Sequence, residues 1–423
     1  MSAKLRLGCI ADDFTGATDL ASQLVSAGMA VVQTIGVPAG PLDADCDAVV
    51  VSLKSRTIDP KEAARQSLEA LEWLRAQGAE RFYFKYCSTF DSTDRGNIGP
   101  VADALLDALG DEFTIAVPAL PANRRTVYNG YLFADDVLLN ESGMQDHPLT
   151  PMRDAFLPRV LQPQTRRTVG LVSHHATAKG GAAVAARIAE LRAQGVGIAV
   201  CDTLDRSDLE AIAEGARDLK LVTGGSGLGL TLPQTLEGFT ARADAAALDR
   251  IEGRSLILAG SCSRATLAQV DAAKARVPAM AVEVEQLFAD FDAHLEELAA
   301  FATTRLGEGP VLLYASMPAG QLRDVQTRFG VETSGEIVER ALAALASRLV
   351  SDGGVRRLVI AGGETSGAVV GALGVSGLRI GPTIDPGVPW TQATWAGQPL
   401  ALALKSGNFG GPDFLTRAFE VLP

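Results

Sequence analysis

The sequence predicts an α/β protein made of two open, mostly parallel α/β domains that face each other across a cleft. Short aliphatic runs, such as residues 358–360, alternate with amphipathic stretches along nearly the whole chain, which is typical of open α/β sheets. The 423 residues include 47% hydrophobic side chains and 43 glycines, a length that favours more than one core. We therefore expect one domain over residues 1–245 and another over residues 250–423.

The first predicted unit is a strand over residues 5–10, followed by Asp12, Asp13 and a helix that ends near Ala27. Ligands of open α/β sheets bind at the carboxyl ends of the strands, which is where both aspartates lie. Two interpretations stay open. One aspartate merely caps the helix, or the pair binds substrate hydroxyls, accepts a proton or binds Mg²⁺.

Two cations follow the third predicted strand, which covers residues 47–52. Because the carboxyl ends of parallel strands meet at one edge, Lys54 and Arg56 belong to the same edge as Asp12. The flanking elements are a strand over residues 30–35 and a helix over residues 60–77.

A hydroxyl-rich loop over residues 87–100 follows the strand of residues 81–86. It contains Asp91, and Lys85 stands directly before it. The loop is either a solvated turn or the binding segment for a hydroxyl-rich anion such as a sugar acid, and its position after a strand favours the second interpretation.

Paired arginines and paired histidines are the other polar features of this half. Arg124 and Arg125 bind a carboxylate or are simply surface charges. His174 and His175 follow a strand over residues 169–173, and on an extended segment they would point to opposite faces, which argues against a shared metal. The remaining predicted elements are strands over 114–117, 198–201 and 219–222, a short antiparallel meander over 127–133, helices over 101–109 and 180–193, and a helix from residue 207.

The second domain is expected after a polar, Ala-rich helix and connection over residues 231–253. Glycines allow backbone N–H groups to approach a phosphate, and a helix N-terminus adds partial positive charge. Alternatively, the glycines after the predicted strands only allow tight turns and bind no ligand, and Ser263 only caps the helix that follows it. The turns after the strands contain Ser261 and Ser263, then Gly362, Gly363, Glu364 and Thr365, and then Lys405, Ser406 and Gly407. The other predicted elements are strands over 255–259, 279–284, 311–314 and 400–404, helices over 286–303 and 334–350, and a rigid loop over 384–390.

Charge and cysteine content restrict the function classes. A net charge of −12 argues against a nucleic-acid or anionic-membrane surface. Five scattered cysteines without a CxxC pair fit a reduced, cytoplasmic protein. We expect neither a secretory leader nor a membrane-spanning helix, because no apolar run reaches about 18 residues.

The division of residue types suggests phosphoryl transfer. Carboxylates, hydroxyls and a few cations gather in the first half, and glycine-rich turns gather in the second. Phosphoryl transfer asks mainly for positioning and charge neutralisation. The chain has no GxxxxGK[ST] loop and no GxGxxG at a helix start. The residues alone thus indicate a two-domain α/β enzyme of the small-molecule kinase class.

Four blocks, over residues 11–17, 85–93, 361–367 and 404–410, resemble the signature blocks of the four-carbon acid sugar kinase family. They occur in the family's order and span nearly the whole chain. The resemblance implies an N-terminal sugar-acid domain, a C-terminal ATP domain and transfer of the γ-phosphoryl group to the terminal hydroxyl. Block 85–93 is similar to the branch that phosphorylates 3-oxo-tetronate at the 4-hydroxyl, and it departs from the threonate pattern at residues 86–90.

The resemblance also implies roles for individual residues. ATP is the expected co-substrate, with Mg²⁺ and a metal site of unknown residues. Asp12 and Asp91 are the candidate general bases, with a preference for Asp12. The expected contacts are Asp12, Arg56, Lys85 and Asp91 for the sugar acid, and Ser261, Ser263, Gly362, Gly363, Glu364, Thr365 and Gly407 for ATP.

Two alternatives to a 3-oxo-tetronate 4-kinase remain at this point. One is a D-threonate or D-erythronate 4-kinase. The other is a non-catalytic sugar-acid sensor, although no basic stripe or helix-turn-helix is evident. The expected partners are the acid and ATP, not nucleic acid or a membrane, and a homo-oligomer is left open.

Overall fold

A parallel sheet forms the core of the first of two units, Met1–Ala246, into which the chain divides. The computed structural model describes residues 5–42, 45–147 and 149–422. The sheet of this unit has the strand order β2-β3-β1-β4-β11-β5-β10-β9, and each adjacent pair is parallel. Its strands are β1 (Leu7–Ala11), β2 (Val31–Ile35), β3 (Ala48–Ser52), β4 (Arg81–Lys85), β5 (Thr114–Val117), β9 (Thr168–Val172), β10 (Val196–Cys201) and β11 (Leu221–Gly224).

The register of the central strands fixes the edge where the polar residues lie. Ala11 at the end of β1 pairs with Ser52 of β3 and with Lys85 of β4. Because β1 and β3 are fully buried, their aliphatic residues form a continuous core, as expected for a parallel sheet covered on both faces. The segments after these three strands therefore begin side by side.

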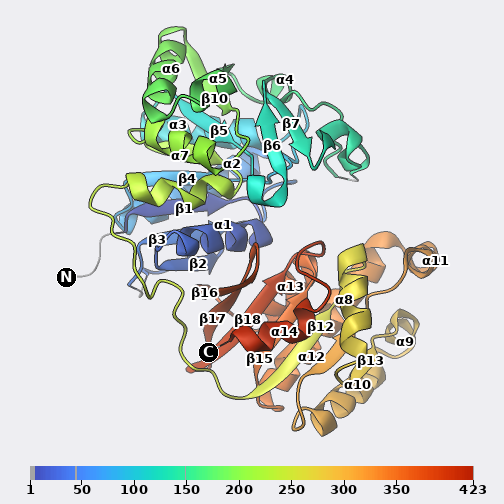
Figure 1. The fold of residues 1–423 in the computed structure, drawn as a ribbon. Helices are drawn as coiled ribbons and strands as arrows, with labels where there is room; N and C mark the ends of the chain where they lie inside the picture. Colours follow the sequence, from blue (N-terminus) through green and yellow to red (C-terminus); the bar gives the residue numbers. More distant parts are fainter. Residues whose placement is uncertain (1–4, 43–44, 148, 423) are drawn as a thin grey trace. The chain divides into compact units, whose positions relative to one another are not determined.

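Local sequence signals explain where the helices of this unit begin. Asp13 caps α1 (Phe14–Ser26) by accepting a hydrogen bond from Gly16 N, and Asp59 caps α2 (Pro60–Ala76), which has proline at its first position, as helix starts favour. The other helices are α3 (Ile98–Leu109), α4 (Leu157–Leu161), α5 (His174–Thr177), α6 (Gly181–Ala193) and α7 (Arg206–Gly215) (Figure 1).

A small antiparallel sheet accompanies the parallel one. Its strands are β6 (Arg125–Tyr128), β7 (Tyr131–Ala134) and β8 (Val137–Leu138), and Asn129 and Gly130 form the turn between β6 and β7. The buried carboxylate of Asp202 holds this turn, because it accepts hydrogen bonds from Asn129 N, Gly130 N and His174 N.

Two local expectations for this unit are wrong. His174 and His175 begin the short helix α5 rather than lying on an extended segment. No α-helix forms over residues 231–253, where the structure has turns and the 3₁₀ segment η6 (Leu232–Thr235). The segment is Ala-rich, but Pro233 and Gly238 interrupt a regular helix.

The second unit, Ala247–Pro423, contains parallel and antiparallel strands. The strands β13-β14-β12-β15-β18 are parallel neighbours, and β17 and β16 continue the order as antiparallel strands. Its strands are β12 (Arg254–Ala259), β13 (Ala279–Ala281), β14 (Val311–Tyr314), β15 (Val355–Ala361), β16 (Gly377–Asp385), β17 (Val388–Trp395) and β18 (Gln398–Lys405).

The helices of the second unit depart from the expectation in two places. Residues 286–303 were expected as one helix, but α9 and α10 divide at Asp290, which caps α10. The expected rigid loop over 384–390 is mostly strand, because a tight turn at residues 386–387 joins β16 to β17. The helices are α8 (Arg264–Lys274), α9 (Val284–Ala289), α10 (Phe291–Arg305), α11 (Ala319–Phe329), α12 (Val331–Ser351), α13 (Gly363–Ala372) and α14 (Phe414–Val421).

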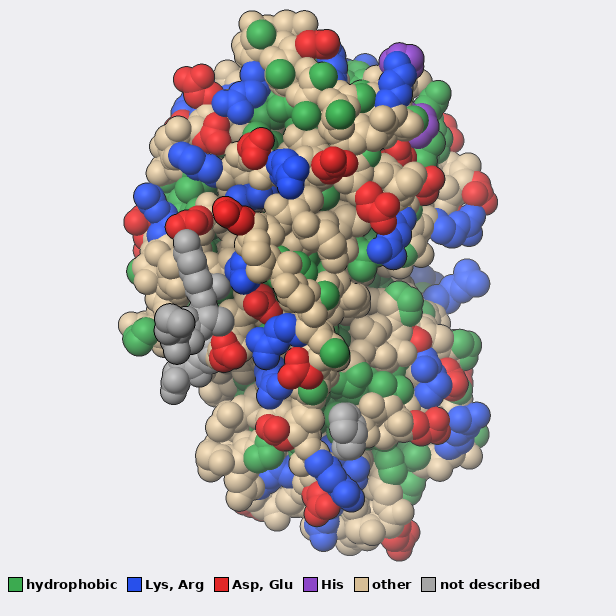
Figure 2. Space-filling view, turned by 60° about the vertical axis from the view of Figure 1, so that its left-hand side comes forward, with side chains coloured by type: hydrophobic (Ala, Val, Ile, Leu, Met, Phe, Trp, Pro, Cys, Tyr) green, Lys and Arg blue, Asp and Glu red, His purple; other side chains and the backbone are tan. Residues whose placement is uncertain are grey.

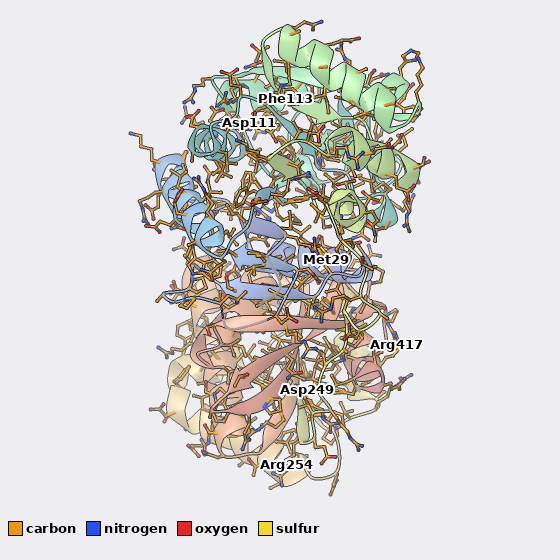
Figure 3. All side chains as sticks on the ribbon, turned by 90° about the vertical axis from the view of Figure 1, so that its left-hand side faces the viewer. Met29, Asp111, Phe113, Asp249, Arg254 and Arg417 are labelled. Carbon is orange, nitrogen blue, oxygen red and sulfur yellow. The ribbon has the colours of Figure 1, made fainter. Side chains whose placement is uncertain are left out.

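Side-chain contacts tie the segment before β12 to the second unit. Asp249 N donates to Gln392 Oε1 at 3.0 Å, and Gln392 Nε2 donates to Asp249 Oδ2 at 2.6 Å. Asp249 and Arg254, at the start of β12, are labelled in Figure 3. Acidic and basic side chains are interspersed over the face shown in Figure 2. Among the described residues, no helix is long and apolar enough to cross a membrane.

Candidate functional site

A cluster of charged side chains lies at the carboxyl ends of β1, β3 and β4. Arg56 forms two parallel hydrogen bonds with Asp12, from Nε to Oδ2 at 3.0 Å and from Nη2 to Oδ1 at 2.8 Å. Its Nη2 also donates to Asp13 Oδ1 at 2.6 Å, and its Nη1 lies 3.7 Å from Asp91 Oδ2. Such bidentate pairs are among the strongest and most directional in proteins. The structure therefore brings Asp12, Arg56 and Asp91 together.

Asn97 determines the position of Arg56. The amide nitrogen of this buried side chain donates to the carbonyl oxygens of Ser55, Arg56 and Ile58 at 2.7, 3.1 and 3.0 Å. Asn97 therefore holds the loop after β3 at the start of α3. Nothing in the sequence indicates that Asn97 holds the backbone around Arg56, which lies about forty residues earlier in the chain.

Lys85 is the second cation of the cluster. Its side chain is 2% exposed, and Nζ donates to the carbonyl oxygen of Tyr86 at 2.8 Å. An ammonium group has three donors, so this bond leaves two of them for another acceptor. Among the described residues Lys85 has no ion pair within 4 Å, in contrast to Arg56. Lys85 is therefore the cation better able to receive the carboxylate of a ligand.

Burial and charge act in opposite directions on the two neighbouring aspartates. Burial raises the pKa of Asp12, although Arg56 lowers it through charge and hydrogen bonding. Burial also favours a higher pKa for Asp13, but the charges of Arg56 and Lys85 outweigh it, so its pKa is lowered. The same carboxylates raise the pKa of Arg56 well above its usual value. The guanidinium thus stays charged, and Asp12 is the carboxylate that more readily takes a proton.

The loop that carries Asp91 has an unusual backbone. Phe90 and Asp91 adopt positive φ angles of 65° and 34°, a region that costs non-glycine residues energy. Phe90 is 1% exposed and packs edge-on against Tyr86. Asp91 Oδ1 accepts a hydrogen bond from Thr89 Oγ1 at 2.6 Å. The buried ring and this hydrogen bond hold the Asp91 carboxylate toward Arg56.

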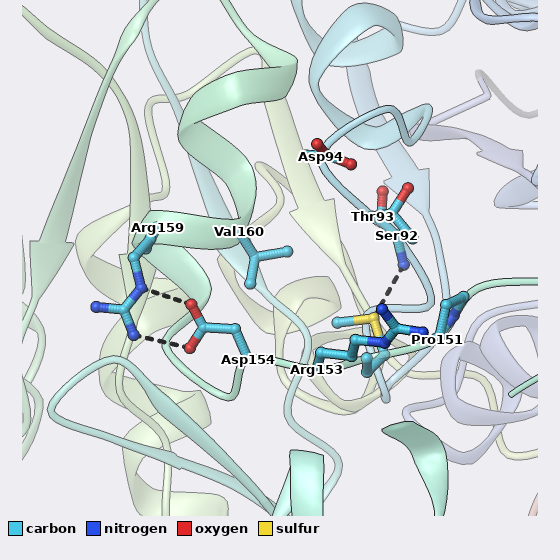
Figure 4. Close-up of a pocket in the computed structure, with 9 residues that line it drawn as sticks. Ser92, Thr93, Asp94, Pro151, Arg153, Asp154, Arg159 and Val160 are labelled. Atoms are coloured by element: carbon cyan, nitrogen blue, oxygen red, sulfur yellow. Dashed lines mark hydrogen bonds and ion pairs between the residues drawn. The ribbon is translucent and has the colours of Figure 1, made fainter. Parts of the chain in front are cut away.

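A cavity of about 350 Å³ borders the same loop (Figure 4). Ser92 N donates to Met152 Sδ at 3.3 Å, and Asp154 is paired with Arg159. The cavity is lined by Ser92, Thr93, Asp94, Pro151, Met152, Arg153, Asp154, Arg159 and Val160. Arg124 and Arg125 are not part of it, because they pair with Asp135 and Asp136 of the small sheet.

Three turns meet at the carboxyl ends of β12, β15 and β18 in the second unit. Gly362 N donates to the carbonyl of Lys405 at 2.8 Å, and Ser261 N donates to the carbonyl of Ala361 at 3.2 Å. A side chain at Gly407 would come within 2.5 Å of Ser261 Oγ. The structure therefore brings together the turns that contain Ser261, Ser263, Gly362–Thr365 and Gly407.

The two serines of the first turn differ in what they offer a ligand. Ser263 caps α8 by accepting from Thr266 N, and its Oγ donates to the carbonyl of Gly407 at 2.6 Å. The hydroxyl of Ser263 is thus already used in hydrogen bonds within the protein. Ser261 Oγ accepts from Ser263 N at 3.2 Å, and its own proton is not used in that contact. Ser261 is therefore the better placed of the two to contact a phosphate.

The start of α13 is open to an anion. Gly362, with φ of 138°, stands before the helix, and no side chain caps it, so the first N–H groups point along the helix dipole toward a ligand. A cavity of about 300 Å³ adjoins this turn. The side chains of Met317, Leu322, Val325 and Val338 give it an apolar wall, and Ser261, Gly362, Gly363, Glu364 and Thr365 line its polar end.

Lys405 and Gln269 are functional candidates that sequence reasoning missed or left unassigned. The buried Lys405 Nζ donates to Thr266 Oγ1, Ser406 O and Gly407 O at 3.0, 2.9 and 2.9 Å. Gln269 Nε2 lies within 3.0 Å of the carbonyl oxygens of residues 409–411. Both side chains fasten the turn after β18 to α8. The sequence feature that could have identified Lys405 is its position at the end of a strand, directly before the turn of Ser406 and Gly407.

If ATP binds at this turn, as the resemblance of the sequence implies, the position of Lys405 predicts that its binding depends on pH. Burial lowers its pKa from 10.5 to about 8, and the neutral amine has only two N–H donors for its three acceptors. We expect the KM for ATP to rise above pH 8, measured by initial rates from pH 6.5 to 9.5. The contribution of Lys405 to the free energy of unfolding should rise with pH between 8 and 10.5, because in this range the unfolded chain holds a proton that the folded chain has lost. Lys405→Met should abolish the pH-dependent step in KM, and a step that persists would contradict this assignment.

Comparisons with known proteins match two family models to the chain. The family model described as a sugar-binding N-terminal domain matches residues 7–232, and the model described as a nucleotide-binding C-terminal domain matches residues 256–415. The chain is 57% identical over 419 residues to a 3-oxo-tetronate kinase of Burkholderia multivorans, covering 98% of this chain and 97% of that protein. A 3-oxo-tetronate kinase of Pseudomonas fluorescens is 55% identical, with the same coverage.

Solved structures extend the similarity to the fold. A protein from Salmonella typhimurium LT2 has a TM-score of 0.91 at 44% identity, covering 99% of this chain and all of that chain. A Haemophilus influenzae protein has a TM-score of 0.84 at 46% identity, with coverage of 98% and 100%. On the match of both family models and of these relatives, the chain belongs to the four-carbon acid sugar kinase family.

Proposed function

We propose that this protein is an ATP-dependent kinase that phosphorylates the 4-hydroxyl of 3-oxo-tetronate. The observation that carries the proposal is the identity of up to 57% with 3-oxo-tetronate kinases over nearly the full length of both chains. The two sites described above support it. One offers carboxylates and cations to a hydroxy acid, and the other offers helix N–H groups and an apolar wall to a nucleotide.

The cluster around Arg56 suggests how the acid binds. The carboxylates of Asp12, Asp13, Asp19 and Asp91 lie around the two cations, Arg56 and Lys85. The acid's own carboxylate therefore needs a cation whose N–H groups are not all hydrogen-bonded to these aspartates. Lys85 is that cation, because the described residues accept only one of its three N–H groups. The guanidinium of Arg56 is already hydrogen-bonded to Asp12 and Asp13. It therefore contributes positive charge to the site but offers the acid no free pair of N–H donors. The hydroxyls of the acid then face the carboxylates.

The reaction forms a bond between the 4-hydroxyl oxygen and the γ-phosphorus and breaks the bond from that phosphorus to the β,γ-bridging oxygen of ATP. The proton of the hydroxyl passes to a carboxylate, for which we propose Asp12 and keep Asp91 as the alternative. Both oxygens of Asp12 are bonded to Arg56, so the acceptor hydroxyl must share one of them. A loose transition state asks little of this base.

The second site supplies charge stabilisation. The N-terminus of α13, Ser261 and the turn at Gly407 would contact the phosphates of ATP, and the apolar wall would receive the nucleoside. These donors are fixed by the fold before the ligand binds, which is what electrostatic stabilisation of phosphoryl transfer requires.

Mg²⁺ is expected to come with ATP. The described residues contain no group of three or more His, Cys, Asp or Glu arranged for a metal, which fits an ion held through phosphates, water and one or two carboxylates rather than by a protein cage. When bound, Mg²⁺ neutralises charge on the transferred group. Because ATP is its expected co-substrate, we propose that the kinase works in the cytoplasm.

A substrate panel tests the proposal. ATP turnover should be measured with 3-oxo-tetronate, D-threonate, L-threonate, D-erythronate and L-erythronate. We expect 3-oxo-tetronate to give a kcat/KM at least about 100-fold above the others, a difference of ~2.7 kcal/mol in barrier. Threonate or erythronate as the best acceptor would replace the substrate assignment. Binding of an acid without consumption of ATP would instead favour a sensor.

A further inference from the structure

Three buried polar groups near the charged cluster lack a full set of partners. Asp19, in the second turn of α1, is 8% exposed, and Ser226, in the loop after β11, is fully buried. Among the described residues, neither Asp19 Oδ1 nor Ser226 Oγ has a hydrogen-bond partner. Lys85, 2% exposed, uses one of its three donors. These groups come from three elements that meet at the sheet edge.

Gly16 explains how Lys85 comes close to this turn of α1. A side chain on Gly16 would approach Lys85 Nζ to 3.0 Å, so the ammonium lies directly against the helix there. Asp19 follows Gly16 by three residues and therefore lies on the same helix face. Burial raises the pKa of Asp19, whereas the charge of Lys85 and the polar side chains of Ser226 and Gln23 lower it. Ser226 and Gln23 therefore lie close to Asp19, although neither Asp19 Oδ1 nor Ser226 Oγ has a partner within hydrogen-bond geometry among the described residues.

Such an arrangement is costly unless a ligand completes it. A buried donor or acceptor without a partner costs about 1–3 kcal/mol, and each such group in a folded protein calls for an explanation. Asp19 accepts, Lys85 donates and Ser226 does either. A carboxylate would be repelled by Asp19 and a cation by Lys85. A hydroxyl group, which both donates and accepts, satisfies all three.

We propose that Asp19 and Ser226 form an inner subsite that binds one hydroxyl group, supplied by the acid substrate at its carbon 2 or by an ordered water molecule. The inference rests on the proposed kinase function for its assignment to carbon 2. With the acid's carboxylate on Lys85, the hydroxyl of the adjacent carbon is the group within reach of Asp19. The subsite then recognises a 2-hydroxy acid, separately from the 4-hydroxyl that receives the phosphoryl group.

A comparison of two acids and two variants tests the subsite. The acids are 3-oxo-tetronate and 4-hydroxy-3-oxobutanoate, which lacks only the 2-hydroxyl. If the acid supplies the hydroxyl, Asp19→Asn should lower kcat/KM about 100-fold for the first acid and less than threefold for the second, with the KM for ATP unchanged. Ser226→Ala should show the same pattern at about tenfold. The matched control is Asp202→Asn, a buried aspartate whose bonds all go to backbone N–H groups. It should lower the melting temperature without discriminating between the acids.

A crystal structure of the wild-type protein, alone and with 3-oxo-tetronate, separates the two sources. An oxygen of the acid within hydrogen-bond distance of Asp19 Oδ1 and Ser226 Oγ assigns the subsite to the substrate. An ordered water there in both crystals, with equal loss for both acids in Asp19→Asn, assigns it to water. A dry contact in both crystals, or unchanged kinetics in both variants, overturns the subsite. If the wild type phosphorylates neither acid, the proposed function fails, and the crystal of the free protein still decides whether a hydroxyl binds.

Discussion

Asp12→Asn is expected to lower kcat at least about 100-fold, or ~2.7 kcal/mol of barrier, while the KM for ATP changes less than threefold. The asparagine amide has one acceptor oxygen where the carboxylate has two, so one of the paired bonds to Arg56 at 2.8 and 3.0 Å is lost and the NH2 group faces a guanidinium donor. It also has no basic oxygen for the proton of the acceptor hydroxyl. Initial rates with ATP and 3-oxo-tetronate varied independently provide the measurement.

Asp103→Asn is the control for this variant. Asp103 is as buried as Asp12, at 8% against 5% exposed, and accepts hydrogen bonds from Thr165 Oγ1 and Arg166 N away from the cluster. We expect it to lower the melting temperature and to leave both KM values within twofold. If Asp12→Asn keeps kcat within tenfold of the wild type, Asp12 is not the base, and Asp91→Asn becomes the variant to measure.

Gly362→Ala is expected to raise the KM for ATP at least about 30-fold, or ~2 kcal/mol, and to leave the KM for the acid within threefold. The φ of Gly362 is 138°, which side chains rarely tolerate. A Cβ there would lie 2.8 Å from Thr365 Oγ1 and 3.3 Å from Ser261 N. The added methyl group would therefore displace the N–H groups that face the phosphates.

Gly374→Ala separates this effect from general backbone strain. Gly374 also has a positive φ, of 65°, and a Cβ there would meet no atom within 4 Å. It lies just past the other end of α13, so its substitution strains the same helix without touching the turn. We expect a loss of stability of about 1 kcal/mol and no change in either KM. Equal KM increases for ATP and the acid in Gly362→Ala would show that the turn is structural only.

The sequence was sufficient to locate the charged cluster because parallel strands have a simple geometry. Once the strands before Asp12, Arg56 and Lys85 are recognised, their carboxyl ends must share an edge, and the register of Ala11 with Ser52 and Lys85 shows that they do. The same reasoning located the three turns of the second unit. Both inferences depend only on where strands end, which hydrophobic runs and glycines mark clearly.

Pairing between side chains was beyond the sequence. The sequence predicts Arg56 as a contact of the sugar acid, but it does not predict that the guanidinium of Arg56 is hydrogen-bonded to Asp12 and Asp13. Which of several nearby charges pair depends on differences of an ångström in side-chain position, and spacing along the chain does not encode these. The expected helix over residues 231–253 failed for a different reason, since alanine content predicts helix only where proline and glycine do not interrupt it.

The backbone at Phe90 and Asp91 has a consequence for how this loop can vary. Glycine would adopt the two positive φ angles without strain, yet a bulky aromatic residue and an acid occupy them. The ring of Phe90 is buried against Tyr86, and this burial offsets the conformational cost that aims Asp91 at Arg56. Core packing and the position of the Asp91 carboxylate are thus joined in adjacent residues, so a substitution that loosens the ring of Phe90 would also shift the carboxylate that lies near Arg56.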